Sequence, residues 1–218
     1  GASYAGEKIG SCRYSDITVF SFHPVKIITT GEGGIALTNN ETLAQQMLLL
    51  RSHGVTRDES LMHGKSHGGW YYQQITLGFN YRMTDIQAAL GLSQLKRLDE
   101  FIAARHRIVD RYEKLLSRFS LSRPWQHPDT VSSFHLYIVE LDHRGAVYDH
   151  LRSEGIGVNV HYIPIHLQPF YQALGFKDGD FPAAEAYYAR ALTLPIHPNL
   201  TEAEQDKVVA ALREAIGR

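Results

Sequence analysis

The chain has 218 residues, of which 44% are hydrophobic, and its formal net charge at pH 7 is −1. A chain of this size can bury a sizeable core and form one large domain or two small ones. Acidic and basic residues are mixed throughout, so no polybasic face indicates nucleic acid, and no cationic amphipathic segment indicates a membrane surface, as a partner. We therefore expect small molecules and protein as partners.

Cysteine use and hydropathy indicate a cytoplasmic protein. The single cysteine, Cys12, rules out an intramolecular disulfide, which fits a reducing compartment. The sequence shows no signal peptide, and its uncharged apolar stretches are far shorter than the roughly 18 residues of a membrane span. The start, Gly1-Ala2-Ser3-Tyr4, has no initiator methionine and is typical of the middle of a domain, so we expect further sequence upstream.

Residues 18–38 contain the most informative pattern of the chain, one lysine between two apolar runs. Lys26 follows a β-prone run and stands between Val25 and Ile27. Such a strand-end lysine either extends its ammonium group to water, which is the commoner situation, or lies in a partly desolvated pocket where a lowered pKa makes its amine a nucleophile. Ser21, on the same strand, could offer a hydroxyl to a bound anion, and the glycines of residues 31–34 allow close backbone approach to a ligand.

Asn39 and Asn40 offer an N-cap, and a helix of about a dozen residues is predicted after them, because apolar residues then recur at helical spacing as far as the sequence R-S-H-G. Gly54, at the end of that sequence, suits the C′ position of the helix. No period holds from residue 55 to 78, which predicts a long loop, and long ordered loops tend to be functional.

Two short patterns in this loop resemble ligand sites but are incomplete. The sequence G-K-S at residues 64–66 lacks the first glycine of a phosphate-binding P-loop, because Glu59 stands in its place. His63 and His67 have no carboxylate or cysteine beside them to complete a zinc site. We therefore expect a solvated loop and no metal.

A capping box formed by Thr84 and Gln87 starts a helical pattern that continues to about residue 117. A helix of this length, on the order of 50 Å, usually bridges two domains, and a bend is expected near residues 101–105. Its start would hold Asn80 and Arg82 rigidly.

The remaining sequence predicts a small α/β domain, because strand and helix patterns alternate. Its predicted elements are a strand (134–141), a helix (146–154), a strand (156–160), a helix (182–188), a strand (192–198) and a final amphipathic helix that Thr201 and Glu204 cap. The loop over residues 161–169 contains two prolines between aromatic residues. It is a candidate for ligand contact, with a rigid surface loop as an equal alternative.

Five motifs occur in an order that resembles the DegT/DnrJ/EryC1/StrS family of sugar aminotransferases, which are pyridoxal phosphate (PLP) enzymes of fold type I. They are F-S-F-x-x-x-K with G-E-G-G at residues 20–34, R-x-H-G at 51–54, G-x-N-x-R-x-T-D at 78–85, H-Y-x-P-x-H at 161–166 and L-P-x-H-P at 194–198. Each motif is weak evidence alone, but the series covers essentially the whole chain. The resemblance implies an α/β fold, with residues 1–103 as the C-terminal part of the PLP-binding large domain and residues 104–218 as a small C-terminal domain.

The resemblance also assigns roles to individual residues. In the family the motif lysine bonds covalently to PLP, which corresponds to Lys26, and the motif serine binds the cofactor phosphate, which corresponds to Ser21. Asn80 matches an asparagine that reaches the phosphate of the neighbouring subunit's cofactor, so the resemblance implies a homodimer with shared sites. The loop that contacts the nucleotide-sugar in the family corresponds to His161, Tyr162, Ile163 and Pro164.

Within the family, the sequences at residues 69–73, 161–171 and 179–185 look most like the branch that serves pseudaminic acid biosynthesis. That branch transfers an amino group from glutamate to C4 of a UDP-4-keto-6-deoxy-N-acetylhexosamine. Two alternatives stay open: amino transfer to another nucleotide-4-keto-sugar, of the GDP-perosamine type, and a non-catalytic module that binds a nucleotide-sugar. The sugar 3-dehydratase branch normally has histidine in place of the lysine, so Lys26 disfavours it.

One departure from the family pattern concerns the aspartate that pairs with the pyridine nitrogen of PLP. In the family it belongs to a D-x-A-H segment, which is expected just before Gly1, and the aromatic residue that stacks on the ring is expected further upstream with the main phosphate loop. Without the aspartate the nitrogen is not held protonated, and the carbanion is poorly stabilised. The 218 residues alone are therefore expected to be inactive unless the missing half is supplied.

Overall fold

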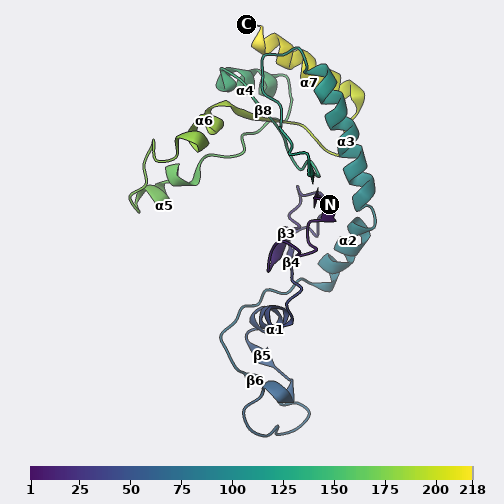
Figure 1. Cartoon of the computed structure of the whole chain (residues 1–218), viewed down its shortest axis with the longest axis vertical. Helices are drawn as coiled ribbons and strands as arrows, with labels where there is room; N and C mark the ends of the chain where they lie inside the picture. The colour runs from purple at the N-terminus through teal and green to yellow at the C-terminus, as the bar shows by residue number, and fades with distance from the viewer. Residues whose placement is uncertain (218) are drawn as a thin grey trace. The chain divides into compact units, whose positions relative to one another are not determined.

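The computed structural model describes residues 1–217, and the chain divides into two compact units, of which the first is Gly1–Leu98 and the second begins at Asp99 (Figure 1). The first unit contains three short antiparallel strand pairs. They are β1 (Ser3–Tyr4) with β2 (Glu7–Lys8), β3 (Thr18–Ser21) with β4 (Gly34–Leu37), and β5 (Val55–Thr56) with β6 (Gln73–Gln74). In β3 the side chains alternate, because Phe20 is partly buried while Val19 and Ser21 are exposed.

Two helices and a short 3₁₀ turn complete the first unit. They are α1 (Glu41–Leu50), η1 (Glu59–Leu61) and α2 (Asp85–Leu95). The predicted N-cap of α1 is confirmed, because Asn40 Oδ1 accepts a hydrogen bond from the Leu43 amide at 3.1 Å. The predicted capping box of α2 is confirmed as well. The prediction for the end of α1 is wrong by two residues, because Arg51 is the C-cap, Ser52 is therefore the C′ residue, and Gly54 lies beyond it with φ +70°.

The segment predicted as a loop, residues 55–78, is a hairpin closed by β5 and β6. The side chain of Gln73 closes its tip, because it accepts from the His63 amide at 2.7 Å and donates to the His63 carbonyl at 2.8 Å. The hairpin is held by strands of two residues each and by the side-chain amide of Gln73. Strands this short do not produce an alternation of apolar and polar residues in the sequence. The sequence therefore carries no signal for the pairing of β5 with β6.

The single long helix predicted after Thr84 is divided in two. α2 ends at Leu95 and α3 (Leu98–Leu115) begins three residues later, before the predicted bend at residues 101–105. At the division the Arg97 amide bonds to the Gln94 carbonyl at 3.0 Å, which is the tighter i to i−3 pattern. Neither glycine nor proline stands there, so the sequence carries no signal for the break.

The second unit has one hydrophobic core built on two paired strands. β8 (Tyr137–Glu140) pairs antiparallel with β9 (Ala191–Leu194), all four residues of which are buried. Helices α3, α4 (Arg144–Ser153) and α7 (Glu202–Ile216) contribute to the same core. Its fully buried side chains include Tyr112, Leu116, Tyr137, Val139, Val147, Leu151, Leu192, Leu194 and Leu212.

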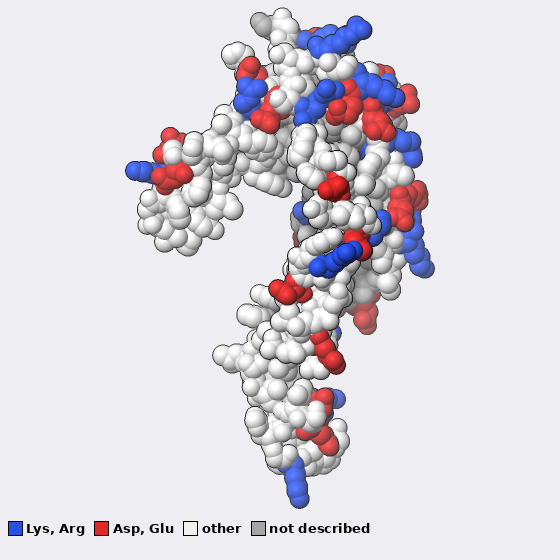
Figure 2. All heavy atoms as spheres, viewed as in Figure 1, with Lys and Arg blue, Asp and Glu red and all other residues white. Residues whose placement is uncertain are grey.

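The remaining elements of the second unit are short. They are β7 (Thr130–Val131), η2 (Ile165–Leu167), α5 (Pro169–Gln172) and α6 (Pro182–Arg190). Within this unit α5 and α6 extend away from β8, and their surface carries few charged groups, whereas acidic and basic groups are interspersed around α3 and α7 (Figures 1 and 2).

The predicted elements of this unit are confirmed in kind, with one exception. The strand expected over residues 156–160 does not form, because the Val158 amide bonds back to the Ile156 carbonyl at 3.0 Å and makes a tight local turn. Only Asn159 pairs with β9, through Thr193. The strand expected over residues 134–141 is shortened to β8, and the helix expected over 146–154 is α4, followed by Gly155 with φ +72°. The strand expected over 192–198 is shortened to β9.

Two buried tyrosines in this core have altered acidity. The rings of Tyr112 and Tyr137 stack with centroids 5.1 Å apart, and neither side chain is exposed. The Tyr112 hydroxyl donates to the Pro195 carbonyl at 3.0 Å, and the Tyr137 hydroxyl donates to Glu113 Oε1 at 2.7 Å. Burial raises the pKa of both hydroxyls, and the hydrogen bond to Glu113 raises that of Tyr137 further.

These shifts predict a loss of stability in alkali. Because the folded pKa lies above the unfolded value of about 10, the stabilising contribution is complete below pH 10 and decreases as the pH rises above it. Each tyrosine contributes a slope of up to about 1.4 kcal/mol per pH unit to the free energy of unfolding. Urea unfolding between pH 8 and 11 should show a smaller slope for Tyr137→Phe than for the exposed Tyr72→Phe control. Equal slopes in the two variants would contradict this assignment.

Candidate functional site

Lys26 lies in the loop between β3 and β4 rather than at the end of the strand. β3 ends at Ser21, and the Lys26 amide bonds to the His23 carbonyl at 2.9 Å, which closes a turn through Pro24. The lysine side chain is partly exposed, and its amine has no hydrogen-bonding or ionic partner among residues 1–217. An amine held on an ordered turn with no partner is open to bond with a ligand.

The hydroxyl of Ser21 is a hydrogen-bond donor at the start of the same loop. Ser21 Oγ accepts from the His23 amide at 3.4 Å, which leaves its proton free to be donated outward. The side chain is exposed. Opposite it, His23 Nε2 lies 3.8 Å from Glu32 Oε1 across the loop. Ser21 and Lys26 therefore offer one hydroxyl and one amine from a single short segment.

Backbone hydrogen bonds fix the path of this loop. The Phe22 amide bonds to the Gly33 carbonyl at 2.8 Å, and the Thr30 amide bonds to the Phe22 carbonyl at 3.0 Å. The Thr29 hydroxyl donates to the same Phe22 carbonyl at 3.0 Å. Both ends of the loop are thus tied to Phe22, one residue after β3.

Thr30 connects the loop to α2. It is only 3% exposed, its hydroxyl donates to the Glu32 carbonyl at 2.7 Å, and Gln87 Nε2 donates to the same carbonyl at 2.9 Å. A Cβ on Gly33 would overlap the Thr30 hydroxyl, and a Cβ on Gly91 would lie 2.8 Å from the Thr30 methyl. Close packing around Thr30 therefore explains why glycine stands at both positions.

Asn80 belongs to a second cluster, in which two of the sequence motifs are paired through their backbones. The Phe79 amide bonds to the Leu50 carbonyl at 2.7 Å, and the His53 amide bonds to the Phe79 carbonyl at 2.8 Å. Where the segments cross, a Cβ on Gly78 would overlap the Gly54 amide nitrogen. The R-x-H-G and G-x-N-x-R motifs are therefore two halves of one local structure.

The side chain of Asn80 is oriented by a basic neighbour. Arg82 Nε donates to Asn80 Oδ1 at 2.9 Å, and Arg82 Nη2 lies 3.5 Å from His53 Nε2. The Asn80 amide group, with two N–H donors, has no partner among the residues that the structure describes. An exposed amide beside a guanidinium suits an anion such as phosphate. The flanking rings of Phe79 and Tyr81 stack at 4.8 Å and are 55% and 74% exposed, which is typical of a surface that another protein covers.

The predicted substrate loop lies in the second unit. His161 Nδ1 is 2.7 Å from Thr193 Oγ1 on β9, whereas Tyr162 and Ile163 are 66% and 48% exposed and Pro164 is buried. The structure thus brings Ser21 and Lys26 together on one loop. No hydrogen bond among the described residues joins either of them to Asn80.

Sequence reasoning missed the residues that support these groups. Thr30 and Gln87 donate to the same carbonyl, that of Glu32, which lies 55 positions from Gln87 along the chain. Thr30 carries no local signal, and the capping box identifies Gln87 only as part of a helix start. Thr193 has a weak signal, because it is the single polar residue inside an apolar strand. A polar residue in such a position generally has a partner when it is buried.

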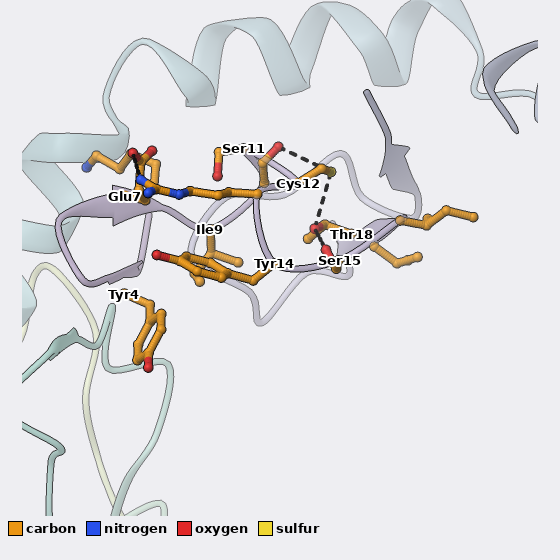
Figure 3. Close-up of a pocket in the computed structure, with 13 residues that line it drawn as sticks. Tyr4, Glu7, Ile9, Ser11, Cys12, Tyr14, Ser15 and Thr18 are labelled. Carbon is orange, nitrogen blue, oxygen red and sulfur yellow. Dashed lines mark hydrogen bonds and ion pairs between the residues drawn. The ribbon is translucent and has the colours of Figure 1, made fainter. Parts of the chain in front are cut away.

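A hollow in the first unit has a lining that does not include Lys26. Figure 3 shows this cavity of about 370 Å³, lined only by residues between Tyr4 and Val19. Its polar groups are engaged, since Cys12 Sγ donates to the Leu37 carbonyl at 3.2 Å and Arg13 pairs with Glu7 at 2.8 Å. None of the predicted site residues lines it.

Residues 1–217 contain neither a metal-binding cluster nor a membrane-spanning helix. No group of three or more His, Cys, Asp or Glu side chains in that range is arranged to hold a metal ion. None of the helices in that range is long and apolar enough to cross a membrane.

Comparison with known proteins gives consistent matches along the chain. The sequence matches the profile of the DegT/DnrJ/EryC1/StrS aminotransferase family over residues 1–213. The GDP-perosamine synthase of Caulobacter vibrioides is 40% identical over 223 aligned residues, which cover 99% of this chain and 56% of that protein.

Solved structures give the same result for the fold. The PLP-form of Spr1654 from Streptococcus pneumoniae has a TM-score of 0.89 at 33% identity, covering 100% of this chain and 55% of its own. Helicobacter pylori PseC, an aminotransferase involved in the biosynthesis of pseudoaminic acid, has a TM-score of 0.88 at 30% identity, covering 100% and 57%. The predicted α/β fold of PLP enzymes of fold type I is thereby confirmed, and the chain spans about half the length of the proteins it matches.

The packing around Thr30 predicts an unusual effect of alanine in a helix. Ala is favoured over Gly in a helix interior by about 1 kcal/mol, but overpacking a tight contact costs about 1–3 kcal/mol. Gly91→Ala should therefore lower the free energy of unfolding, as measured by urea denaturation. Thr30→Ser removes the methyl group and keeps the hydroxyl that bonds to Glu32, so the double variant should recover the loss.

A matched control is available in the second unit. A Cβ on Gly145 of α4 would meet no atom within 4 Å, so Gly145→Ala should not lower stability. A Gly91→Ala/Thr30→Ser variant no more stable than Gly91→Ala would show that the Thr30 methyl is not the obstacle.

Proposed function

Because the chain belongs to the DegT/DnrJ/EryC1/StrS aminotransferase family, we propose that the complete protein is a PLP-dependent aminotransferase acting on a nucleotide-sugar. The observation that carries this proposal is the loop between β3 and β4. It presents the partnerless amine of Lys26 and the exposed hydroxyl of Ser21 on a backbone fixed by Thr30. The activity is proposed for the complete protein, since the chain spans 56% of the perosamine synthase.

The residues of this chain fit PLP in two respects, the covalent bond to the cofactor and the contact with its phosphate. Lys26 Nζ would bond to the cofactor and, when displaced by the amino donor, would carry a proton between the donor's α-carbon and the cofactor. Ser21 would donate its hydroxyl proton to the cofactor phosphate. When bound, PLP supplies an electron sink for the carbanion formed during amino transfer. We propose glutamate as the amino donor.

We propose a homodimer in which Asn80 contacts the phosphate of the neighbouring subunit's cofactor. Arg82 holds Asn80 Oδ1, so the amide N–H groups remain for an anion that lies outside the local structure. The exposed rings of Phe79 and Tyr81 on either side support burial of this segment against a second subunit.

We propose C4 of a UDP-4-keto-6-deoxy-N-acetylhexosamine as the acceptor, with His161, Tyr162, Ile163 and Pro164 in contact with the nucleotide-sugar. The likeness to PseC at 30% identity supports this choice. The perosamine synthase at 40% identity favours the alternative, a GDP-4-keto-sugar. Turnover of the two keto-sugars by the complete protein, compared at equal concentration, would decide between them.

Loss of Lys26 should abolish covalent cofactor binding. The complete protein with PLP is expected to show a visible absorbance band that glutamate removes, and Lys26→Ala should lack the band because no amine remains on the loop. Lys65→Ala, which removes an exposed lysine from the hairpin tip, serves as the control and should keep the band. Turnover of a keto-sugar with glutamate by the Lys26→Ala protein would refute the role of this residue.

Shared sites predict complementation between two inactive variants. Lys26→Ala and Asn80→Ala proteins should each be inactive, whereas a mixture should regain part of the activity, because some heterodimers contain one intact site. Subunit exchange is checked by mass spectrometry of tagged subunits. Exchange without any return of activity would mean that Asn80 acts within its own subunit.

A further inference from the structure

The proposed substrate loop is held at both ends by buried polar contacts. At its start, His161 Nδ1 lies 2.7 Å from Thr193 Oγ1, and Thr193 is 7% exposed in β9. The backbone of Thr193 is fixed too, because its amide bonds to the Asn159 carbonyl at 2.8 Å. The first contact therefore joins the loop to the core strand pair.

The second contact lies just after the loop. His166 is 8% exposed, and its Nε2 lies 2.7 Å from Glu185 Oε1 on α6. The same carboxylate accepts from the Gly179 amide at 2.9 Å and from the Phe181 amide at 3.3 Å. The hydrogen bond from His166 lowers the pKa of Glu185, with the two amides in support. This carboxylate thus ties three segments of the second unit together, and both of its oxygens are already hydrogen-bonded within that unit.

Between the two contacts, the exposed groups have little freedom. The His161 and Tyr162 rings meet edge to face with centroids 4.5 Å apart, so fixing His161 also orients Tyr162. After Ile163, the Pro164 carbonyl accepts from the Leu167 amide at 3.0 Å and starts η2. A loop that is already ordered loses less entropy when it binds a ligand.

We propose that Thr193 and Glu185 are positioning residues that hold the loop from His161 to Pro164 in its ligand-binding conformation without touching the ligand. The inference rests on the proposed function in one respect, that the ligand is a nucleotide-sugar. Thr193 acts through His161 on Tyr162, and Glu185 acts through His166 on Pro164. Tyr162 is then the polar side chain that the loop presents to the ligand.

The test distinguishes the effect of the Thr193 hydroxyl from the effect of the side chain's volume. Thr193→Val keeps the volume and removes the hydroxyl, whereas Thr193→Ser keeps the hydroxyl and removes the methyl group. Glu185→Gln removes the charge that His166 and two amides share. The matched control is Thr201→Val, because Thr201 caps α7 through Glu204 and its loss lowers stability without touching the loop.

Two measurements are made on the complete protein. Amide hydrogen exchange over residues 161–168 should be at least about tenfold faster in Thr193→Val and Glu185→Gln than in wild type, and near wild type in Thr193→Ser and Thr201→Val. The Kd for UDP-N-acetylglucosamine, used as the probe in calorimetry, should rise about tenfold in the same two variants, which corresponds to 1.4 kcal/mol.

Three results of these measurements would overturn the proposal. Unchanged exchange in Thr193→Val and Glu185→Gln overturns the proposal, as does faster exchange with an unchanged Kd. Equal losses in Thr193→Val and Thr193→Ser would assign Thr193 a packing role and overturn it as well. Failure of the wild type to bind the probe would instead count against the proposed function, and the exchange data would still decide whether the two contacts hold the loop.

Discussion

The burial of Thr30 is the constraint on which the lysine loop depends. A threonine side chain packed between Gly33 and Gly91 leaves no room for a Cβ at either position, so the loop and α2 can meet in only one way. The shared acceptor, the carbonyl of Glu32, then receives one hydrogen bond from each side. Because these contacts fix the loop against α2, Lys26 can project an amine that no group among residues 1–217 engages.

The same principle operates at the second cluster of the first unit. Gly54 and Gly78 let two backbone segments cross at a distance that side chains would prevent, and the crossing sets the direction of Asn80. In the second unit, the hydrogen bonds between His161 and Thr193 and between His166 and Glu185 replace glycine packing as the means of fixing a loop. In each case an exposed side chain is held in place by neighbouring residues that are buried or too closely packed to move.

The features that the sequence predicted well are local ones. Capping boxes such as Thr84 with Gln87 need only four consecutive residues, and the helical stripes need only one face. The features that the sequence did not predict either depend on residues far away along the chain or occur where no residue type marks them. The division of the long helix at Lys96 occurs without glycine or proline, and the hairpin before Gly78 is closed by a single glutamine. The hydrogen bonds between Gln87 and Glu32 and between His161 and Thr193 span 55 and 32 positions along the chain, beyond the reach of any periodic pattern.

The central claim is that Lys26 is the residue that bonds to PLP, and chemical trapping tests it most directly. Borohydride reduction of the PLP-loaded protein makes a lysine–cofactor bond permanent, and peptide mass spectrometry then locates it. The account predicts a phosphopyridoxyl group on the peptide that contains Lys26 and on no other. A group attached at another lysine, or unmodified Lys26 in a protein that has kept its visible band, would contradict the account.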